Sequence, residues 1–303
     1  MTLFEAIIEN RLAFVNRYLE GGGDPNLCND TGSTLLHEAV YEGSIDMIRL
    51  LLAFGASVHK VDAFGNTPMH LAGIYGRQDA AFWLLHHGAE IDSTTEHRPW
   101  TPLMLALNEN NREMAHWLIK RGANPDHVEP QQGWTPFLVA CEQGLTDITL
   151  DLIQRGVQVD ARLIAGDARG RSGVHLASYY GAVEIIRALV ERGVDVNQIP
   201  EGGGLGPLHW AVYNHHQELF DYLLRLKPDV NLQAAGIYYS RTPLHFSVSG
   251  DREYMTMRLL QAGADPLFKD QEERSPLDIA LDRFEETGLS VHERMILLLE
   301  SFI

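Results

Sequence analysis

The chain has 303 residues, of which 45% are hydrophobic and 21% charged, and this composition excludes both a disordered polymer and a membrane-embedded protein. Its formal net charge of −17, with no run of basic residues, repels nucleic-acid phosphate and anionic lipid. Two cysteines are too few for a disulfide scaffold or a thiolate metal site and fit a reducing compartment.

The chain carries no strong targeting or membrane signal. Residues 1–20 mix acidic and apolar side chains without a basic start, which argues against a secretory signal peptide. The unbroken apolar runs are short, as at residues 295–299, far from the roughly 20 residues of a spanning helix. We therefore expect a soluble protein of the cytoplasm that inserts into no membrane, with secretion by a signal-independent route left open.

A short string recurs along the chain. Residues 67–72 read TPMHLA, residues 101–106 read TPLMLA and residues 135–140 read TPFLVA. The copies begin at positions 34, 67, 101, 135, 172, 206, 242 and 275, with spacings of 33 to 37 residues. Such a fixed period predicts a repeat architecture, in which each copy is one structural unit stacked on the next.

Further markers keep the same phase as this string. An apolar pair such as Leu51-Leu52 follows 17 residues after each of the first seven starts, and a glycine turn such as Gly55-Ala56 comes soon after in most of them. The Thr can cap a helix, and the following Pro suits its first turn. The turn glycine suits the left-handed residue that ends a second helix. Each unit is therefore predicted to be a helix–turn–helix.

These phased markers resemble the ankyrin repeat, whose signature is the Thr-Pro-Leu-His-x-Ala string on a period near 33 residues. The resemblance covers essentially the whole chain and implies an all-α ankyrin-repeat solenoid with β-turn fingers between the units. We expect nine units in one domain, 1–303: an N-terminal capping repeat at 1–32, seven internal repeats at 33–270 and a C-terminal capping repeat at 271–303. In the last unit, residues 285–291 are expected to lengthen the loop between the two helices.

The abundant histidines suggest no metal site. Five of the 14 occupy the same place in the repeat string, so we expect them to bond backbone groups of the inter-repeat turn; these are His37, His70, His175, His209 and His245. The zinc motifs His-Glu-x-x-His and Cys-x-x-Cys are both missing from the sequence. Glycine runs at 21–23 and 202–204 lack the continuation of a phosphate-binding loop and are read as turns. We expect neither a metal nor a cofactor.

No nucleophile constellation supports an enzyme. Cys141 follows the motif alanine of its repeat and is expected to be buried, whereas Cys28 is expected in an exposed turn. A remote enzymatic alternative would place a site in the groove around Glu109, Glu142 and His97. Because a fold imposes no chemistry, we expect a protein without catalytic residues.

The tyrosines are the most informative feature. In ankyrin stacks the concave ligand-reading surface is built from the fingers and the last turn of each first helix, and seven of the ten tyrosines fall there. Tyr and Trp with interleaved Arg carry the binding energy of many protein interfaces. Packing between adjacent fingers is the rival explanation. The predicted partner-binding residues are Tyr41, Phe64, Tyr75, Arg98, Trp100, Trp134, Arg169, Arg171, Tyr179, Tyr180, Tyr213, Tyr238, Tyr239 and Arg241.

Other aromatic residues lie at packing phases inside the helices and are expected to fill the core: Trp83, Trp117, Phe137, Trp210 and Phe246. Two fingers, 161–171 and 232–241, are enlarged and carry apolar residues. Insertions in repeat proteins often lie on the binding face, although neutral surface drift is an alternative.

A smaller resemblance concerns two hairpins. The segments around Asn197 and Asn231 look like the ankyrin hairpin that a cellular asparaginyl hydroxylase can modify, which makes these residues candidate acceptors. A turn asparagine that bonds its own backbone explains the same residue without any modification.

The sequence thus predicts a non-catalytic scaffold or adaptor that binds a protein partner of unknown identity, as a monomer and without nucleic acid. The alternative within the same class is a specialised inhibitor, an immunity protein or a secreted microbial effector that binds a target protein.

Overall fold

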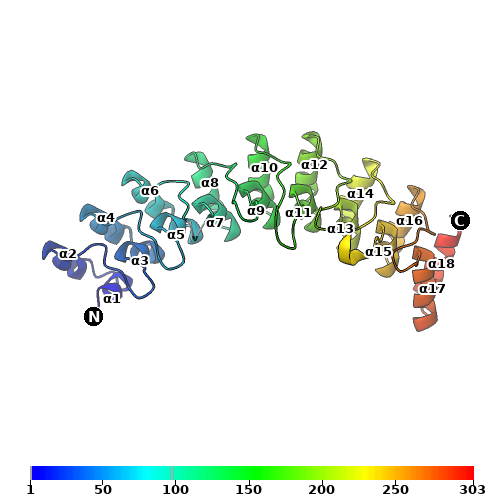
Figure 1. Cartoon of the computed structure of the whole chain (residues 1–303), viewed down its shortest axis with the longest axis horizontal. Helices are drawn as coiled ribbons and strands as arrows, with labels where there is room; N and C mark the ends of the chain where they lie inside the picture. Colours follow the sequence, from blue (N-terminus) through cyan, green and yellow to red (C-terminus); the bar gives the residue numbers. More distant parts are fainter. Residues whose placement is uncertain (1, 96, 98) are drawn as a thin grey trace. The chain divides into compact units, whose positions relative to one another are not determined.

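The computed structural model describes residues 2–95, 97 and 99–303. Over this part of the chain it contains eighteen α-helices, one short 3-10 helix and no β-strand, so the predicted all-α class is confirmed. Consecutive helices lie side by side as pairs, one pair for each predicted repeat (Figure 1).

The contacts within the chain define two compact units, Met1–Pro130 and Gln131–Ile303. We describe each by itself, and the single uninterrupted stack stays a prediction. The first unit contains α1 (Leu3–Ile8), α2 (Leu12–Glu20), α3 (Leu35–Glu42), α4 (Ile45–Ala53), α5 (Pro68–Ile74), α6 (Gln78–His86), α7 (Pro102–Asn108) and α8 (Arg112–Lys120).

The second unit contains five further pairs and a short helix within one finger. Its elements are α9 (Pro136–Glu142), α10 (Thr146–Gln154), α11 (Gly173–Tyr179), α12 (Val183–Glu191), α13 (Pro207–Tyr213), α14 (Gln217–Arg225), η1 (Gly236–Tyr238), α15 (Pro243–Ser249), α16 (Glu253–Gln261), α17 (Pro276–Thr287) and α18 (Ser290–Glu300).

The first helices begin where the Thr-Pro string predicts. The hydroxyl groups of Thr34, Thr67, Thr101, Thr135 and Ser275 each accept a hydrogen bond from a backbone N–H in the first turn of the helix. This bond satisfies one of the N–H groups that a helix start leaves without a partner. The predicted capping role is thereby confirmed.

Glycine ends most of the second helices in the left-handed conformation, as predicted. The second residue after the helix has a φ of 84° at Gly55, 90° at Gly88 and 94° at Gly263, values that L side chains adopt only with strain. The same place after α14 holds Lys227, whose φ is 53°.

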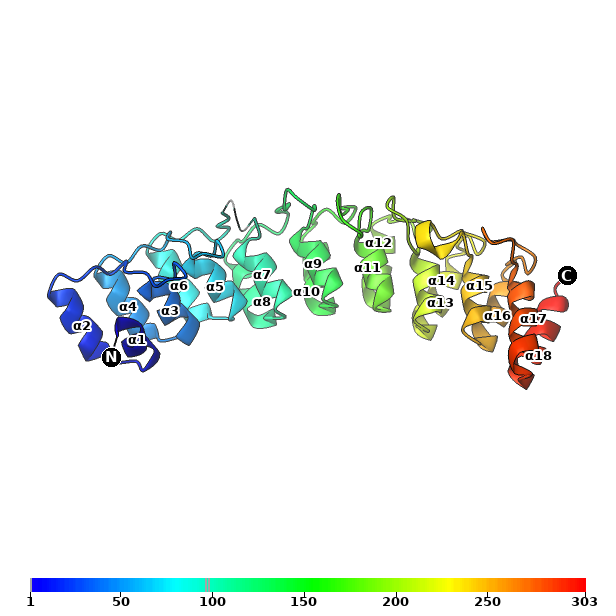
Figure 2. The same cartoon turned by 60° about the horizontal axis from the view of Figure 1, so that its bottom comes forward.

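In each unit the first helices of neighbouring repeats pack on one another, and so do second helices such as α2 and α4 or α10 and α12. The fingers run along one edge of each unit (Figure 2). The motif alanines, such as Ala72 and Ala106, and the apolar pair residues, such as Leu84 and Leu118, are fully buried. The repeat markers in the sequence are therefore the residues of the core.

Four of the five motif histidines join neighbouring repeats, as predicted. Nδ1 of His175 lies 3.1 Å from the backbone N of Ser172, and its Nε2 lies 3.1 Å from the carbonyl oxygen of Gln198 in the next finger. The Nε2 atoms of His37, His209 and His245 reach the finger carbonyls of Asn66, Arg241 and Arg274 in the same way. Each ring is satisfied as a neutral imidazole that accepts at Nδ1 and donates at Nε2.

The last repeat differs from the prediction. Residues 285–291 do not lengthen a loop: α17 continues to Thr287 and has 12 residues, against seven in α15, and α18 starts at Ser290. The helix extends because residues 281–287 contain neither glycine nor proline, and Gly288 ends it with a φ of 65°.

Candidate functional site

The tyrosines predicted to face a partner lie at the C-terminal ends of first helices. Tyr41 is in the last turn of α3, Tyr75 follows α5, Tyr179 ends α11, Tyr180 follows it and Tyr213 ends α13. Their exposed fractions lie between 43% and 49%. In each unit, we call the surface formed by these helix ends and by the fingers before the first helices the first-helix face.

In the first unit two tyrosines form a pair. The rings of Tyr41 and Tyr75 meet edge to face, with centroids 4.8 Å apart and planes at 89°. Burial raises the pKa of Tyr75, and Tyr41, Glu109, Asp62 and Glu38 raise it further, so its hydroxyl remains a donor at neutral pH.

The fingers of this unit carry two more of the predicted residues. Phe64 is 67% exposed, which is unusual for so large an apolar side chain, and Trp100 is half-buried. Arg98 lies outside the described residues.

In the second unit the aromatic side chains form a continuous row. Ring centroids are 4.9 Å apart between Tyr180 and Tyr179, 5.0 Å between Tyr179 and Trp210, and 6.0 Å between Trp210 and Tyr213. The row continues from Tyr213 to Phe246 at 5.8 Å and from Phe246 to Tyr238 at 6.2 Å. We call these six side chains the aromatic row.

The row combines buried and exposed members. Trp210 and Phe246 are only 8% and 9% exposed, which confirms their predicted place in the core. Both rings also pack against the tyrosines of the row, a role that the sequence analysis missed. Each buried ring therefore fixes the orientation of a half-exposed one through an edge-to-face contact.

Side chains from the next repeat hold the backbone of these tyrosines in place. Nη2 of Arg77 donates to the carbonyl oxygen of Tyr41 at 2.8 Å, and Nη2 of Arg252 donates to that of Tyr213 at the same distance. The carbonyl oxygen of Tyr179 accepts from Asn214 and lies 2.8 Å from Nε2 of His216. Helix-end carbonyls that would otherwise require water are thus used to fix the first-helix face.

A small pocket opens beside the aromatic row in the second unit. It has a volume of about 250 Å³ and is lined by Glu142, Arg171, His175, Leu176, Tyr179, Tyr180 and Trp210. Burial raises the pKa of Glu142, while the Arg171 guanidinium acts in the opposite direction. Burial also raises the pKa of Tyr180, with Glu142 adding to the effect. Of the predicted arginines that the structure describes, Arg171 lines this pocket.

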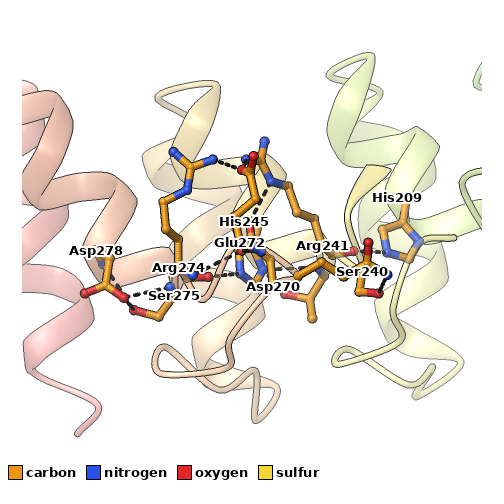
Figure 3. Close-up of polar contacts among 11 residues, drawn as sticks. His209, Ser240, Arg241, His245, Asp270, Glu272, Arg274, Ser275 and Asp278 are labelled. Carbon is orange, nitrogen blue, oxygen red and sulfur yellow. Dashed lines mark hydrogen bonds and ion pairs between the residues drawn. The ribbon is translucent and has the colours of Figure 1, made fainter. Parts of the chain in front are cut away.

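Arg241 has partners within the chain. Its Nε lies 3.0 Å from Oδ2 of Asp270, and its Nη2 lies 3.2 Å from Oε2 of Glu272 (Figure 3). Burial would raise the pKa of Asp270, but the hydrogen bonds from the backbone of Arg274 and from Arg241 outweigh it and lower that pKa. Because two carboxylates already bind this guanidinium, we do not propose Arg241 as a residue that contacts the partner.

Of the other predicted finger residues, some are exposed and others contact neighbouring side chains of the same chain. Arg169 is exposed, and Nε1 of Trp134 donates to Oε1 of Gln132 at 3.1 Å. Tyr239 is 46% exposed, has a φ of 55° and lies with its ring 5.9 Å from the guanidinium carbon of Arg241. In the enlarged finger 232–241, Ile237 is 80% exposed.

The two candidate hydroxylation acceptors serve as inter-repeat links. Oδ1 of Asn197 accepts from the backbone N–H of Asp229, and Oδ1 of Asn231 accepts from that of Asp265, both at 2.9 Å. This bonding explains an asparagine at each position without any modification. Their hydroxylation stays a prediction.

The structure offers little support for the remote enzymatic alternative, whose three residues belong to two different units. Glu142 belongs to the second unit, and Glu109 and His97 to the first. His175 beside Glu142 has both ring nitrogens bonded within the chain. Cys141 is fully buried, as predicted, and burial raises its pKa, whereas Cys28 is exposed. Within residues 2–95, 97 and 99–303, no three or more His, Cys, Asp or Glu side chains lie close enough together to hold a metal ion.

The outer helices of the first unit carry a hollow that the sequence analysis missed. It measures about 650 Å³, and its lining includes Leu12, Arg49, Leu50 and Trp83 from α2, α4 and α6. The guanidinium carbon of Arg49 lies 4.9 Å from the centre of the Trp83 ring. Trp83 and Trp117 are half-buried on these second helices, so the prediction that they fill the core was wrong. The helical phase placed both residues toward neighbouring helices but did not show that Arg side chains would cover them.

The comparisons with known proteins agree with the observed architecture. A sequence model of ankyrin repeats matches residues 3–95, 92–163, 152–234 and 208–288. The chain therefore belongs to the ankyrin-repeat family, whose members generally mediate protein–protein interaction. The solved human ASB11 ankyrin repeat domain superposes with a TM-score of 0.58 at 28% identity, covering 69% of this chain and 90% of that domain.

The curated relatives match over shorter stretches. Palmitoyltransferase Hip14 of Drosophila melanogaster is 36% identical over 96 residues, which is 32% of this chain and 15% of the relative. Human palmitoyltransferase ZDHHC13 is 38% identical over 104 residues, which is 34% of this chain and 16% of the relative. Because the match spans so little of these proteins, the acyl transfer in their names is not assigned to this chain. No described helix is long and apolar enough to cross a bilayer.

Proposed function

We propose that this protein is a non-catalytic scaffold or adaptor that binds a protein partner through its first-helix face. The observation that carries the proposal is the aromatic row, in which buried Trp210 and Phe246 hold half-exposed tyrosines in fixed orientations. Large, rigid amphipathic side chains of this kind supply contact area at low cost in conformational entropy.

Packing between aromatic side chains accounts for only part of their arrangement. Tyr179, Tyr180 and Tyr213 contact other rings, yet each keeps 46% to 49% of its surface exposed. The Tyr41–Tyr75 pair in the first unit behaves in the same way. Exposed aromatic surface that internal packing leaves uncovered is typical of an interaction site.

The surface is suited to a partner that docks without rearranging it. Hydrogen bonds from Arg77, Arg252 and Asn214 fix the backbone carbonyls at the tyrosine-bearing helix ends. We therefore expect binding with little change in the backbone. We also propose that the net charge of −17 favours protein over nucleic acid as the partner.

Affinity capture from a lysate of the source cells tests this proposal. We compare the wild-type chain with a variant that carries Tyr75→Ser, Tyr180→Ser and Tyr213→Ser. The matched control carries Phe14→Ser, Phe54→Ser and Phe82→Ser, which remove aromatic side chains of similar exposure from the second-helix side. Circular dichroism melts verify that all three chains are folded.

The expected result is a protein retained by the wild type and the phenylalanine variant but lost by the tyrosine variant. Retention of the same proteins by all three chains would contradict the proposed surface. A scaffold and an inhibitor use the same contacts, and the activity of the captured partner with and without this chain distinguishes them.

A further inference from the structure

The pocket beside the aromatic row contains one carboxylate and one guanidinium that do not neutralise each other. Glu142 ends α9 and Arg171 precedes α11, and both line the same space of about 250 Å³. Among the described residues neither side chain forms an ion pair or a hydrogen bond, although the Arg171 guanidinium acts to lower the pKa of Glu142. Two opposite charges are thus available to a ligand at different points of one pocket wall.

The remaining lining is neutral and mostly aromatic. Tyr179 stands at 82° to Tyr180 and at 80° to Trp210, so the three rings form walls at nearly right angles. Leu176 adds an apolar side chain, and both ring nitrogens of His175 are bonded within the chain. The charges of the pocket therefore sum to zero and point to a ligand that is neutral but dipolar.

We propose that this pocket receives the side-chain carboxamide of an asparagine or glutamine in the bound protein partner. The amide N–H₂ donates to Glu142, the amide oxygen accepts from Arg171, and the apolar part of the side chain packs against the rings. The inference rests on the proposed function, because the carboxamide belongs to a partner bound at the first-helix face. A primary carboxamide presents the donor and the acceptor within one planar group, as this pair of charges requires.

The same pair of charges rejects other side chains. Glu142 repels a carboxylate, and Arg171 repels an ammonium or guanidinium group. An apolar side chain of similar size would leave both charged groups desolvated without partners, which is costly in a partly buried site. Specificity for the neutral amide therefore comes as much from repulsion of the alternatives as from the two hydrogen bonds.

Selection from a displayed library of random peptides tests the inference with the full chain. The wild-type protein is immobilised, and the library is first depleted on the Tyr75→Ser, Tyr180→Ser, Tyr213→Ser variant to remove peptides that bind elsewhere. We expect the remaining peptides to share an asparagine or glutamine at one position. Replacing that residue by Asp, Lys or Ala in a synthetic peptide should weaken binding by at least about tenfold.

Variants of the chain test the roles of the two charges. Glu142→Ala and Arg171→Ala should each weaken binding of the selected peptide by at least about tenfold. The controls Glu184→Ala and Arg225→Ala remove exposed charges on second helices and should leave it unchanged. A selection repeated on Arg171→Glu should replace the shared amide by lysine or arginine, because the pocket then carries two carboxylates.

The failures of the two proposals are distinguishable. Tyrosine-dependent peptides that share an acidic, basic or apolar residue would overturn the carboxamide while leaving the first-helix face as the binding surface. The carboxamide proposal would also be overturned if amide-containing peptides bound the Glu142→Ala and Arg171→Ala variants as tightly as they bind the wild-type protein. If no selected peptide depends on the tyrosines, the proposed binding surface itself is contradicted, and the carboxamide site with it.

Discussion

At the scale of single residues, buried polar side chains join one repeat to the next. His175, His209 and His245 bond the capping backbone of their own repeat and a carbonyl of the following finger. Burial lowers the pKa of each to about 4, from an ordinary value of 6.5. The folded protein therefore holds these rings neutral where the unfolded chain protonates them.

The stability of the protein should fall on acidification. Between pH 6.5 and pH 4 the unfolded chain binds more protons than the folded one at these histidines, so stability is full above this range and is lost as the pH falls through it. Each of the three should contribute a loss of about 2 kcal/mol between roughly pH 7 and 5. Urea unfolding at several pH values measures this loss, and a midpoint that does not change with pH would contradict the account.

Arg241 provides a second prediction at this scale. The Asp270 side chain is completely buried and pairs with Arg241, whose own side chain is 22% exposed. Arg241→Ala leaves a buried carboxylate without its cation and should lower the free energy of unfolding by about 2 kcal/mol or more. Arg169→Ala, at an exposed finger position, is the control and should change it little. Equal melting temperatures for the two variants would show that the Arg241 ion pair contributes nothing.

At the scale of the helices, the turns inside the repeats depend on left-handed residues. The position between the two helices of a pair holds Gly43, Gly76, Gly144 and Gly181 in four repeats, with φ values from 64° to 75°. In the pair α13 and α14 the same position holds His215, with a φ of 59°. A residue with a Cβ atom is sterically strained in this conformation, whereas glycine is not.

Replacing His215 by glycine should therefore stabilise the protein. His215 is exposed, so His215→Gly relieves backbone strain without removing a buried contact. We expect a gain of about 0.5–1 kcal/mol in the free energy of unfolding. The opposite change, Gly181→Ala, should destabilise, because its Cβ would come within 2.6 Å of the His216 ring. Denaturant unfolding measures both changes, and a loss of stability in His215→Gly would refute the strain.

The last repeat shows how far the periodic pattern predicts single elements. The pair Leu297-Leu298 comes later in its repeat than the corresponding pairs do, which indicated extra residues. The sequence analysis assigned these residues to a loop. The residues between Leu281 and Gly288 carry no helix-breaking signal, and they extend α17 instead. Phase indicates that residues are inserted, whereas the glycine and proline positions decide where the helix ends.

At the scale of the whole molecule, the repeat period predicted the fold because the phased residues form the core. The same periodicity explains the exposed tyrosines, since they fall outside the buried phases. It could not predict the pocket, because Glu142 and Arg171 come from neighbouring repeats and meet only through the stacking of α9 on α11. The outer hollow was missed for a related reason: Trp83 has a core-like phase but lies under Arg49 of the preceding repeat.

A calorimetric titration of the captured partner into the wild type and into Tyr180→Ala tests the central claim most directly. Tyr180 lies in the aromatic row, lines the pocket and is 46% exposed, so its truncation removes contact area without opening the core. The account predicts a loss of about 2 kcal/mol or more in binding free energy, with the melting curve unchanged. An unchanged affinity in a folded Tyr180→Ala protein would contradict binding through the first-helix face.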